Sequence, residues 1–239
     1  MQQDYTRTGS PMKDERGYLS DDQCNAMLKA CEGRDKLLLL MLLKTGRRIS
    51  EVVRNNDTGI RYMDIDLEEG QIYFRILKHG KRNKKTKEYI PDKDRIAVQI
   101  DDELRDKLKY YIGLYCPHPE GYLFDFSRQR GFQIVQEIAL RAAKEHPNLF
   151  TVGLTKTHKD GRFGNVVRVQ LGDGFIKAHT TRHTFAMHAA NALDSPAALV
   201  DLSQNFLHHG NLGTTMHYLR HGKKEKSRQK ELINKIWKK

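Results

Sequence analysis

The first third of the chain carries a hydrophobic pattern typical of two helices. Ser20 is followed by two acidic residues and by Gln23, which predicts an N-cap with a capping box for a helix that runs through Ala30. A second helix is predicted over residues 35–45, in which residues 37–43 are all Leu or Met. Because this helix is apolar on every side, we expect it to be central to the core.

The middle of the chain changes to a pattern of strands and turns. Residues 71–77 and 88–90 have strand patterns and flank a basic stretch, residues 79–87, so we predict a hairpin that carries its charge at the tip. Helical patterns return over residues 101–115 and 127–146.

The last third is less regular at first and then helical again. Residues 151–177 contain several glycines and predict an irregular hairpin or loop, whereas helical patterns dominate from Thr180 onward. We expect a flexible N-terminal tail over residues 1–17, one folded domain over residues 18–220, and a basic C-terminal tail or helix over residues 221–239.

Charge adds an expected partner to this picture. The chain has 42 Lys and Arg against 30 Asp and Glu, a formal net charge of +12, which suits a polyanion such as nucleic acid or an anionic membrane surface. The longest apolar run, residues 37–43, is too short to span a bilayer, so we expect no membrane insertion. Cys24, Cys31 and Cys116 lack the spacing of a disulfide framework or a zinc site, and we expect a reducing, intracellular setting.

Two clusters combine arginine with a defined local structure. Residues 45–51 place Arg47 and Arg48 directly after the buried helix and a glycine, and a guanidinium can bind two phosphate oxygens at once. In the second cluster, His179 and Arg182 are three residues apart, which predicts that both address one phosphate from the same helix face. Taken alone, each cluster also fits an ordinary role, such as a surface ion pair or a structural arginine.

The third cluster, residues 207–218, joins His209 to Tyr218. The hydroxyl of tyrosine is a poor nucleophile because its free pKa is about 10, so it needs neighbouring cations or a base to lose its proton. Taken alone, this tyrosine also fits a packed aromatic residue.

Together the clusters resemble the tyrosine recombinase family of phage integrases and Xer-type resolvases. The family's T-G-x-R-x-S-E corresponds to residues 45–51, its H-x-x-R-H-T-F-A to residues 179–186, and its histidine nine residues before the tyrosine to His209 and Tyr218. The similarity spans roughly residues 18–220. It implies an α+β fold that is mainly helical, with a small antiparallel β-sheet.

The resemblance also implies a role for each matched residue. Arg48 and Arg182 bind the non-bridging oxygens of the scissile phosphate, and His209 donates another hydrogen bond to it. Tyr218 attacks the phosphorus to form a 3′-phosphotyrosine and releases a 5′-hydroxyl, while His179 acts as an acid or base. Because clustered cations stabilise the charge on the phosphate, no metal and no cofactor are expected.

The family's lysine lies in a β-hairpin and protonates the leaving 5′-oxygen. Counting from the turn at Gly70 favours Lys78, whereas the sequence of residues 80–84 imitates another version of the hairpin and favours Lys81. The sequence leaves both open. The other basic residues of the hairpin are expected on the DNA backbone, where they add salt-dependent affinity; the candidate DNA-binding residues are Lys81, Arg82, Lys84 and Lys85.

Two positions depart from the family pattern. Arg47 stands where an apolar residue usually follows the glycine, and His208 replaces the glycine common before the second histidine. The R-x-S-E register selects Arg48. Relatives commonly carry a separate helical domain before the catalytic one, so we expect this chain to be either a minimal enzyme or an excised catalytic domain.

The function implied by the resemblance is site-specific recombination of double-stranded DNA in the cytoplasm, at the nucleoid, by a tetramer of protomers on two DNA sites. A type IB topoisomerase, which uses a similar residue set, and a DNA-binding protein that never cuts are the alternatives. The Arg-His-Thr-Phe-Ala and Leu-His-His-Gly-Asn flanks favour the recombinase. A C-terminal helix over residues 224–237 is expected either to dock on a neighbouring protomer or to cover the core of its own subunit.

Overall fold

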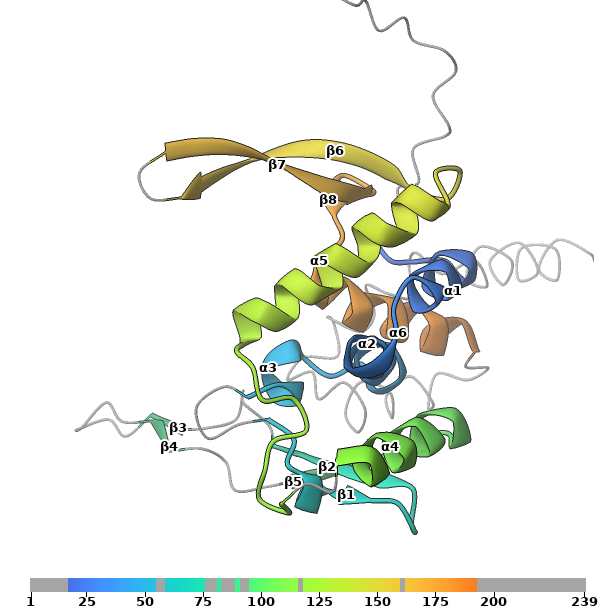
Figure 1. The fold of residues 1–239 in the computed structure, drawn as a ribbon, viewed down its shortest axis with the longest axis vertical. Coiled ribbons are helices and arrows are strands. Elements are labelled where there is room, and N and C mark those ends of the chain that lie inside the picture. The colour runs from blue at the N-terminus through green and yellow to red at the C-terminus, as the bar shows by residue number, and fades with distance from the viewer. Residues whose placement is uncertain are drawn as a thin grey trace, which may run out of the picture.

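The computed structural model describes residues 17–54, 59–75, 81–82, 89–90, 95–115, 118–159 and 162–192 of the 239-residue chain. For residues 81–82, 89–90, 156–159 and 162–163 it describes the backbone alone. A body of helices carries small antiparallel sheets at its two ends (Figure 1). This architecture confirms the expected α+β, mainly helical class.

The helices begin and end close to the predicted positions. Ser20 caps the first helix through a capping box in which the Gln23 amide donates to the Ser20 hydroxyl and the Ser20 amide donates to the Gln23 side chain, at 3.2 and 3.0 Å. Within the described residues the α-helices are α1 (Asp21–Lys29), α2 (Gly33–Thr45), α3 (Ile49–Val52), α4 (Asp102–Tyr115), α5 (Arg128–Glu145) and α6 (Ala178–Ala192).

Helix α2 lies in the middle of the body, in contact with α1, α4, α5 and α6 (Figure 1). Its residues 37–42 are all buried, as expected for a helix that is apolar on every side. Because four helices pack on α2, its C-terminal end is held in a fixed place, and this end positions the candidate site.

The sheet beside α4 differs from the predicted hairpin in its pairing. Strand β2 (Gln71–Arg75) lies between β1 (Ile65–Asp66) and β5 (Arg95–Gln99), whereas β3 (Lys81–Arg82) pairs with β4 (Tyr89–Ile90) in a separate ladder. We predicted that residues 71–77 would pair with residues 88–90, and that pairing is wrong. The apolar faces explain the difference, because buried Ile72 pairs with buried Val98 and places both in the core.

The segment predicted as an irregular hairpin or loop is a regular ribbon. Strand β6 (Thr151–Lys159) pairs with β7 (Arg162–Leu171) without interruption from Thr151 opposite Gln170 to Lys159 opposite Arg162. Short strand β8 (Gly174–Phe175) adds to the base of β7, and the chain then enters α6. Every helix in the described part of the chain is too short or too polar to cross a bilayer.

Candidate active site

The turn between α2 and α3 is the structural centre of the candidate site. Gly46 ends α2 in the left-handed conformation, with φ 62°, and its amide donates to the carbonyl of Leu42 at 3.2 Å. The hydroxyl of Thr45 donates to the carbonyl of Met41 at 2.6 Å and further fixes the last turn. The chain therefore turns sharply and presents Arg47 and Arg48 at the end of the central helix.

The two neighbouring arginines point in different directions. Arg47 is only 2% exposed, and its Cζ lies 5.3 Å from the centroid of the Phe74 ring on β2. Burial lowers the pKa of Arg47 to about 10, against the opposing effect of the Glu51 charge. Arg48 is the N-cap residue of α3, and its side chain is 18% exposed. Of the pair, Arg48 is therefore the one that reaches the surface.

Glu51 holds Arg48 in place by two contacts. The Nη1 of Arg48 donates to Oε1 of Glu51 at 2.7 Å, and the backbone amide of Arg48 donates to Oε2 at 2.9 Å. The Glu51 side chain is buried, so this charge-assisted pair is shielded from water. The carboxylate therefore fixes both the helix start and the guanidinium.

Helix α6 brings the second candidate arginine to the same turn. Arg182 is buried, and its Nη1 donates to the carbonyl oxygen of Gly46 at 2.8 Å. The ring of Phe185 lies against Gly46 so closely that a Cβ at this glycine would be 2.3 Å from Cδ1 of the ring. Arg182 thus reaches, from α6, the same turn that carries Arg48, which places two cationic side chains distant in sequence in one part of the fold.

His179 lies one turn before Arg182 on α6 and is exposed. Its ring is perpendicular to that of His183, with 4.6 Å between the centroids. The two candidate residues of this motif therefore differ in environment, with the imidazole toward solvent and the guanidinium in the core. A histidine so placed can exchange protons with bulk water.

The start of the described chain fixes α6 along its length. The amide of Leu19 donates to the hydroxyl of Thr184 at 3.0 Å, and Nε2 of His188 lies 3.0 Å from the carbonyl oxygen of Leu19. Tyr18 packs with Ala186 and Met187 in a second small hydrophobic cluster. The helix that carries His179 and Arg182 is therefore held by residues 18–19 as well as by the α2–α3 turn.

The other sequence-predicted site residues are described in part or not at all. Lys81 and Arg82 form strand β3, for which the backbone alone is described. Lys78, Lys84, Lys85, His209 and Tyr218 lie outside the described residues.

Sequence reasoning missed three features of the α2–α3 turn. It did not identify the Gly46 carbonyl as the acceptor for Arg182, the burial of Arg47, or Glu51 as the partner of Arg48. Only Glu51 had a signal in the sequence, because a Glu three residues after an N-cap is typical of a capping box.

Arg47→Leu is expected to raise the free energy of unfolding by about 1–2 kcal/mol, because replacing a buried charge by an apolar side chain removes its desolvation cost. Glu51 keeps Arg48 as its ion-pair partner in this variant. Urea denaturation of the variant beside Arg47→Lys, which keeps the charge but not the planar fork, provides the measurement. A loss of stability in Arg47→Leu would instead show that contacts of the guanidinium outweigh its desolvation.

Comparison with known proteins gives similarities in sequence and in fold. The family model described as "Phage integrase family" matches residues 17–225. The type 1 fimbriae regulatory protein FimE of Escherichia coli (strain K12) is 39% identical over 71 residues, which are 28% of this chain and 33% of that protein. The chain is thus matched to about a third of the length of this curated relative.

Two solved structures share the fold at low sequence identity. The XerA recombinase superimposes with a TM-score of 0.59 at 19% identity, over 98% of this chain and 68% of that one. The XerH site-specific recombinase, solved bound to its palindromic difH substrate after cleavage, gives a TM-score of 0.54 at 18% identity, over 94% of this chain and 53% of that one. These similarities show a common fold.

Proposed function

Because the chain belongs to the phage integrase family, we propose that it is a site-specific recombinase that cleaves and rejoins double-stranded DNA through a phosphotyrosyl bond. The observation that carries the proposal is that Arg182 reaches, from α6, the same turn after α2 that carries Arg48. Two fixed guanidinium groups suit a phosphodiester, whose non-bridging oxygens gain negative charge during displacement at phosphorus. The difH-bound structure of XerH supports duplex DNA as the partner.

In the proposed reaction, the hydroxyl oxygen of Tyr218 attacks the scissile phosphorus. A bond forms between this oxygen and phosphorus, the bond from phosphorus to the 5′-oxygen breaks, and the DNA 3′ end stays attached to the protein. The phosphodiester energy is conserved in the new bond, so attack by a 5′-hydroxyl reverses the step without another energy source.

The matched residues supply charge and protons for this step. Arg48 and Arg182 bind the non-bridging oxygens, and His209 donates a further hydrogen bond to the phosphate. His179 accepts the proton of Tyr218 during attack and returns it when the step reverses, in keeping with its exposed place on α6. The leaving 5′-oxygen takes its proton from a lysine of the basic segment, for which Lys78 is our first choice and Lys81 the second.

The remaining proposals concern DNA binding and assembly. Lys81, Arg82, Lys84 and Lys85 contact the DNA backbone, and residues 18–220 form the catalytic domain. Two cleaved duplexes must exchange strands, so we propose that protomers assemble as a tetramer on two DNA sites.

Covalent capture on DNA tests the proposal directly. The protein is incubated with labelled, nicked duplexes from its own replicon, denatured with detergent, and examined for label that travels with protein. A nick beside the cleavage position lets the short fragment that carries the free 5′-hydroxyl diffuse away, so the adduct accumulates. Covalent label supports the proposal and identifies the site, whereas DNA binding without any adduct supports a protein that binds but does not cut.

Glu51→Gln is expected to lower the rate of covalent capture about 10-fold while DNA affinity changes little. The amide keeps the shape of the carboxylate but loses the charge that fixes Arg48, and a hydrogen bond to a charged group is worth about 1.5–3 kcal/mol.

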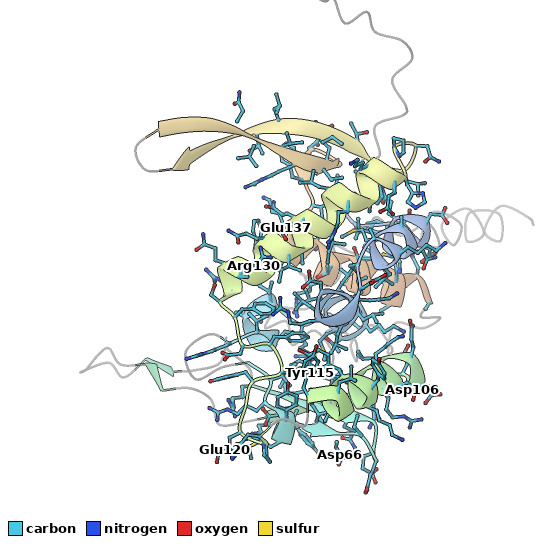
Figure 2. The ribbon with its side chains drawn as sticks, in the orientation of Figure 1. Asp66, Asp106, Tyr115, Glu120, Arg130 and Glu137 are labelled. Carbon is cyan, nitrogen blue, oxygen red and sulfur yellow. The ribbon has the colours of Figure 1, made fainter. Side chains whose placement is uncertain are left out.

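A matched control for Glu51→Gln is Glu137→Gln. Glu137 pairs with Arg130 at 2.6 Å on the exposed side of α5, where both are labelled in Figure 2. An exposed pair contributes little, so the control should capture DNA at the normal rate. Equal rates for both variants would show that Glu51 does not position Arg48 for the reaction.

A further inference from the structure

The β6–β7 hairpin is the most prominent feature that the proposed reaction does not use. Its strands have 9 and 10 residues, and about 3.3 Å per residue makes an arm of roughly 30 Å. It leaves the body at the end of α5 and extends to the side on which α3 and the first turn of α5 lie (Figure 1). The short β3–β4 ladder extends to the same side, with α3 between the two hairpins in this view.

The base of the hairpin is built into the core. Phe150, Val169 and Leu171 are buried with the main hydrophobic cluster, and the amide of Ile176 donates to the carbonyl of Val169 at 2.9 Å. Strand β8 pairs with the last two residues of β7. The arm is therefore held firmly at its root, while within the described residues β6 pairs with β7 alone.

The two faces of the ribbon have different chemistry. On one face the register groups Thr151, Thr155, Arg168 and Gln170, which can donate hydrogen bonds, with Gly153 and the exposed Val166 among them. The opposite face continues outward from the core as an exposed apolar row, formed by Val152, Leu154 and Val167. The hairpin is thus anchored by one face and presents donors on the other.

The charge of the hairpin points to a polyanion. The hairpin, residues 151–171, contains four basic residues, Lys156, Lys159, Arg162 and Arg168, against a single acidic one, Asp160, although the whole chain has 30 acidic residues in 239. A two-stranded ribbon of this kind fits the major groove of DNA, and Lys, Arg and Thr are typical contacts to phosphate oxygens.

We propose that the β6–β7 hairpin is a second DNA-binding arm, which grips the duplex backbone beside the cleavage site on the opposite side of α3 from the basic β3–β4 segment. The inference rests on the proposed function insofar as both take duplex DNA as the partner. Lys156, Lys159 and Arg162, toward the end of the arm, supply the charge that it brings to phosphate.

Salt dependence of DNA binding tests the arm. The triple variant Lys156→Gln/Lys159→Gln/Arg162→Gln and the unchanged protein are titrated onto a labelled 30-base-pair duplex by fluorescence anisotropy at several salt concentrations. Each lost phosphate contact reduces the slope of log Kobs against log salt by about 0.9, so a reduction of about 2–3 is expected. An unchanged slope overturns the proposal.

The apolar row provides the matched control, Leu154→Thr/Val167→Thr. Both replacements put a β-branched threonine in the strand and leave the charge unchanged, so the salt slope should stay the same. If this control abolishes self-association in sedimentation while the triple variant binds DNA normally, the hairpin is a contact between protein copies and the proposal is wrong.

The outcome for the arm is separable from that for the catalytic proposal. A reduced salt slope in the triple variant, together with failure of covalent capture, supports the arm and contradicts the recombinase. Successful capture with an unchanged slope supports the recombinase and contradicts the arm. Urea denaturation of the variants confirms that each is folded before the slopes are compared.

Discussion

Tyr218→Phe is expected to abolish the covalent protein–DNA adduct while leaving DNA affinity unchanged. Phenylalanine keeps the ring but removes the oxygen that forms the bond to phosphorus, so the variant has no nucleophile at this position. Loss of a nucleophile lowers the rate by orders of magnitude, because the cationic side chains of the site cannot form the covalent intermediate by themselves. Detergent-resistant label on a nicked duplex measures the adduct, and anisotropy on the same duplex measures affinity.

Tyr110→Phe is the matched control for this experiment. Tyr110 is an exposed residue of α4, so removal of its hydroxyl should change neither capture nor affinity. An adduct of normal yield in Tyr218→Phe would show that another residue is the nucleophile. Loss of affinity together with loss of the adduct would show that the hydroxyl contributes to binding rather than to bond formation.

Gly46→Ala is expected to lower the free energy of unfolding by about 2–4 kcal/mol, as the sum of a left-handed backbone and an overpacked contact. The backbone at Gly46 has φ 62°, and the new Cβ would meet the ring of Phe185 at 2.3 Å. The ring of Phe185 must shift to admit this Cβ, and it belongs to α6, whose Arg182 donates a hydrogen bond to the Gly46 carbonyl. Cleavage activity should therefore fall with stability, as followed by urea denaturation and covalent capture.

Gly113→Ala separates this effect from that of glycine replacement in general. Gly113 lies within α4, and a Cβ there meets nothing within 4 Å, so the variant should be more stable by about 0.5–1 kcal/mol. The double variant Gly46→Ala/Phe185→Leu should recover part of the loss, because a smaller side chain relieves the contact. Equal stability of Gly46→Ala and the unchanged protein would contradict the close packing of α2 on α6.

The helices were predictable because their determinants are local. Ser20 and Gln23 form the predicted capping box, and the apolar block of α2 is buried as its pattern requires. The pairing of strands could not be predicted in the same way, because the choice between partner strands depends on which apolar faces reach the core. Residues 71–75 pair with residues 95–99, which the intervening basic segment obscures in the sequence.

The ribbon formed by β6 and β7 shows a second limit of sequence reasoning. Glycines such as Gly153 and Gly164 indicate turns, yet here both lie in regular strand. The β-branched residues, Thr in β6 and Val in β7, are the signal that favours a ribbon, and the buried root at Val169 stabilises it.

At the candidate site, the sequence identified residue types but not their contacts. The order of the motifs selected Arg48 and Arg182 as partners on one phosphate, and the Arg182 side chain reaches from α6 to the turn that carries Arg48. It could not reveal that Arg182 bonds to a backbone carbonyl, since no side chain marks that acceptor. Nor could it show that Arg47 is buried, because charged residues are rarely found in a core.

The hydrogen bond from Arg182 to Gly46 joins residues that are 136 positions apart, and that from Leu19 to Thr184 joins residues 165 apart. Both close long loops, which form late when a chain folds because their entropy cost is paid before other contacts compensate it. During synthesis, a nascent chain that ends before α6 contains Arg48 but has no Arg182 to set beside it. Both contacts therefore form only after α6 has been made, so the turn that carries Arg48 is completed by a segment far along the chain.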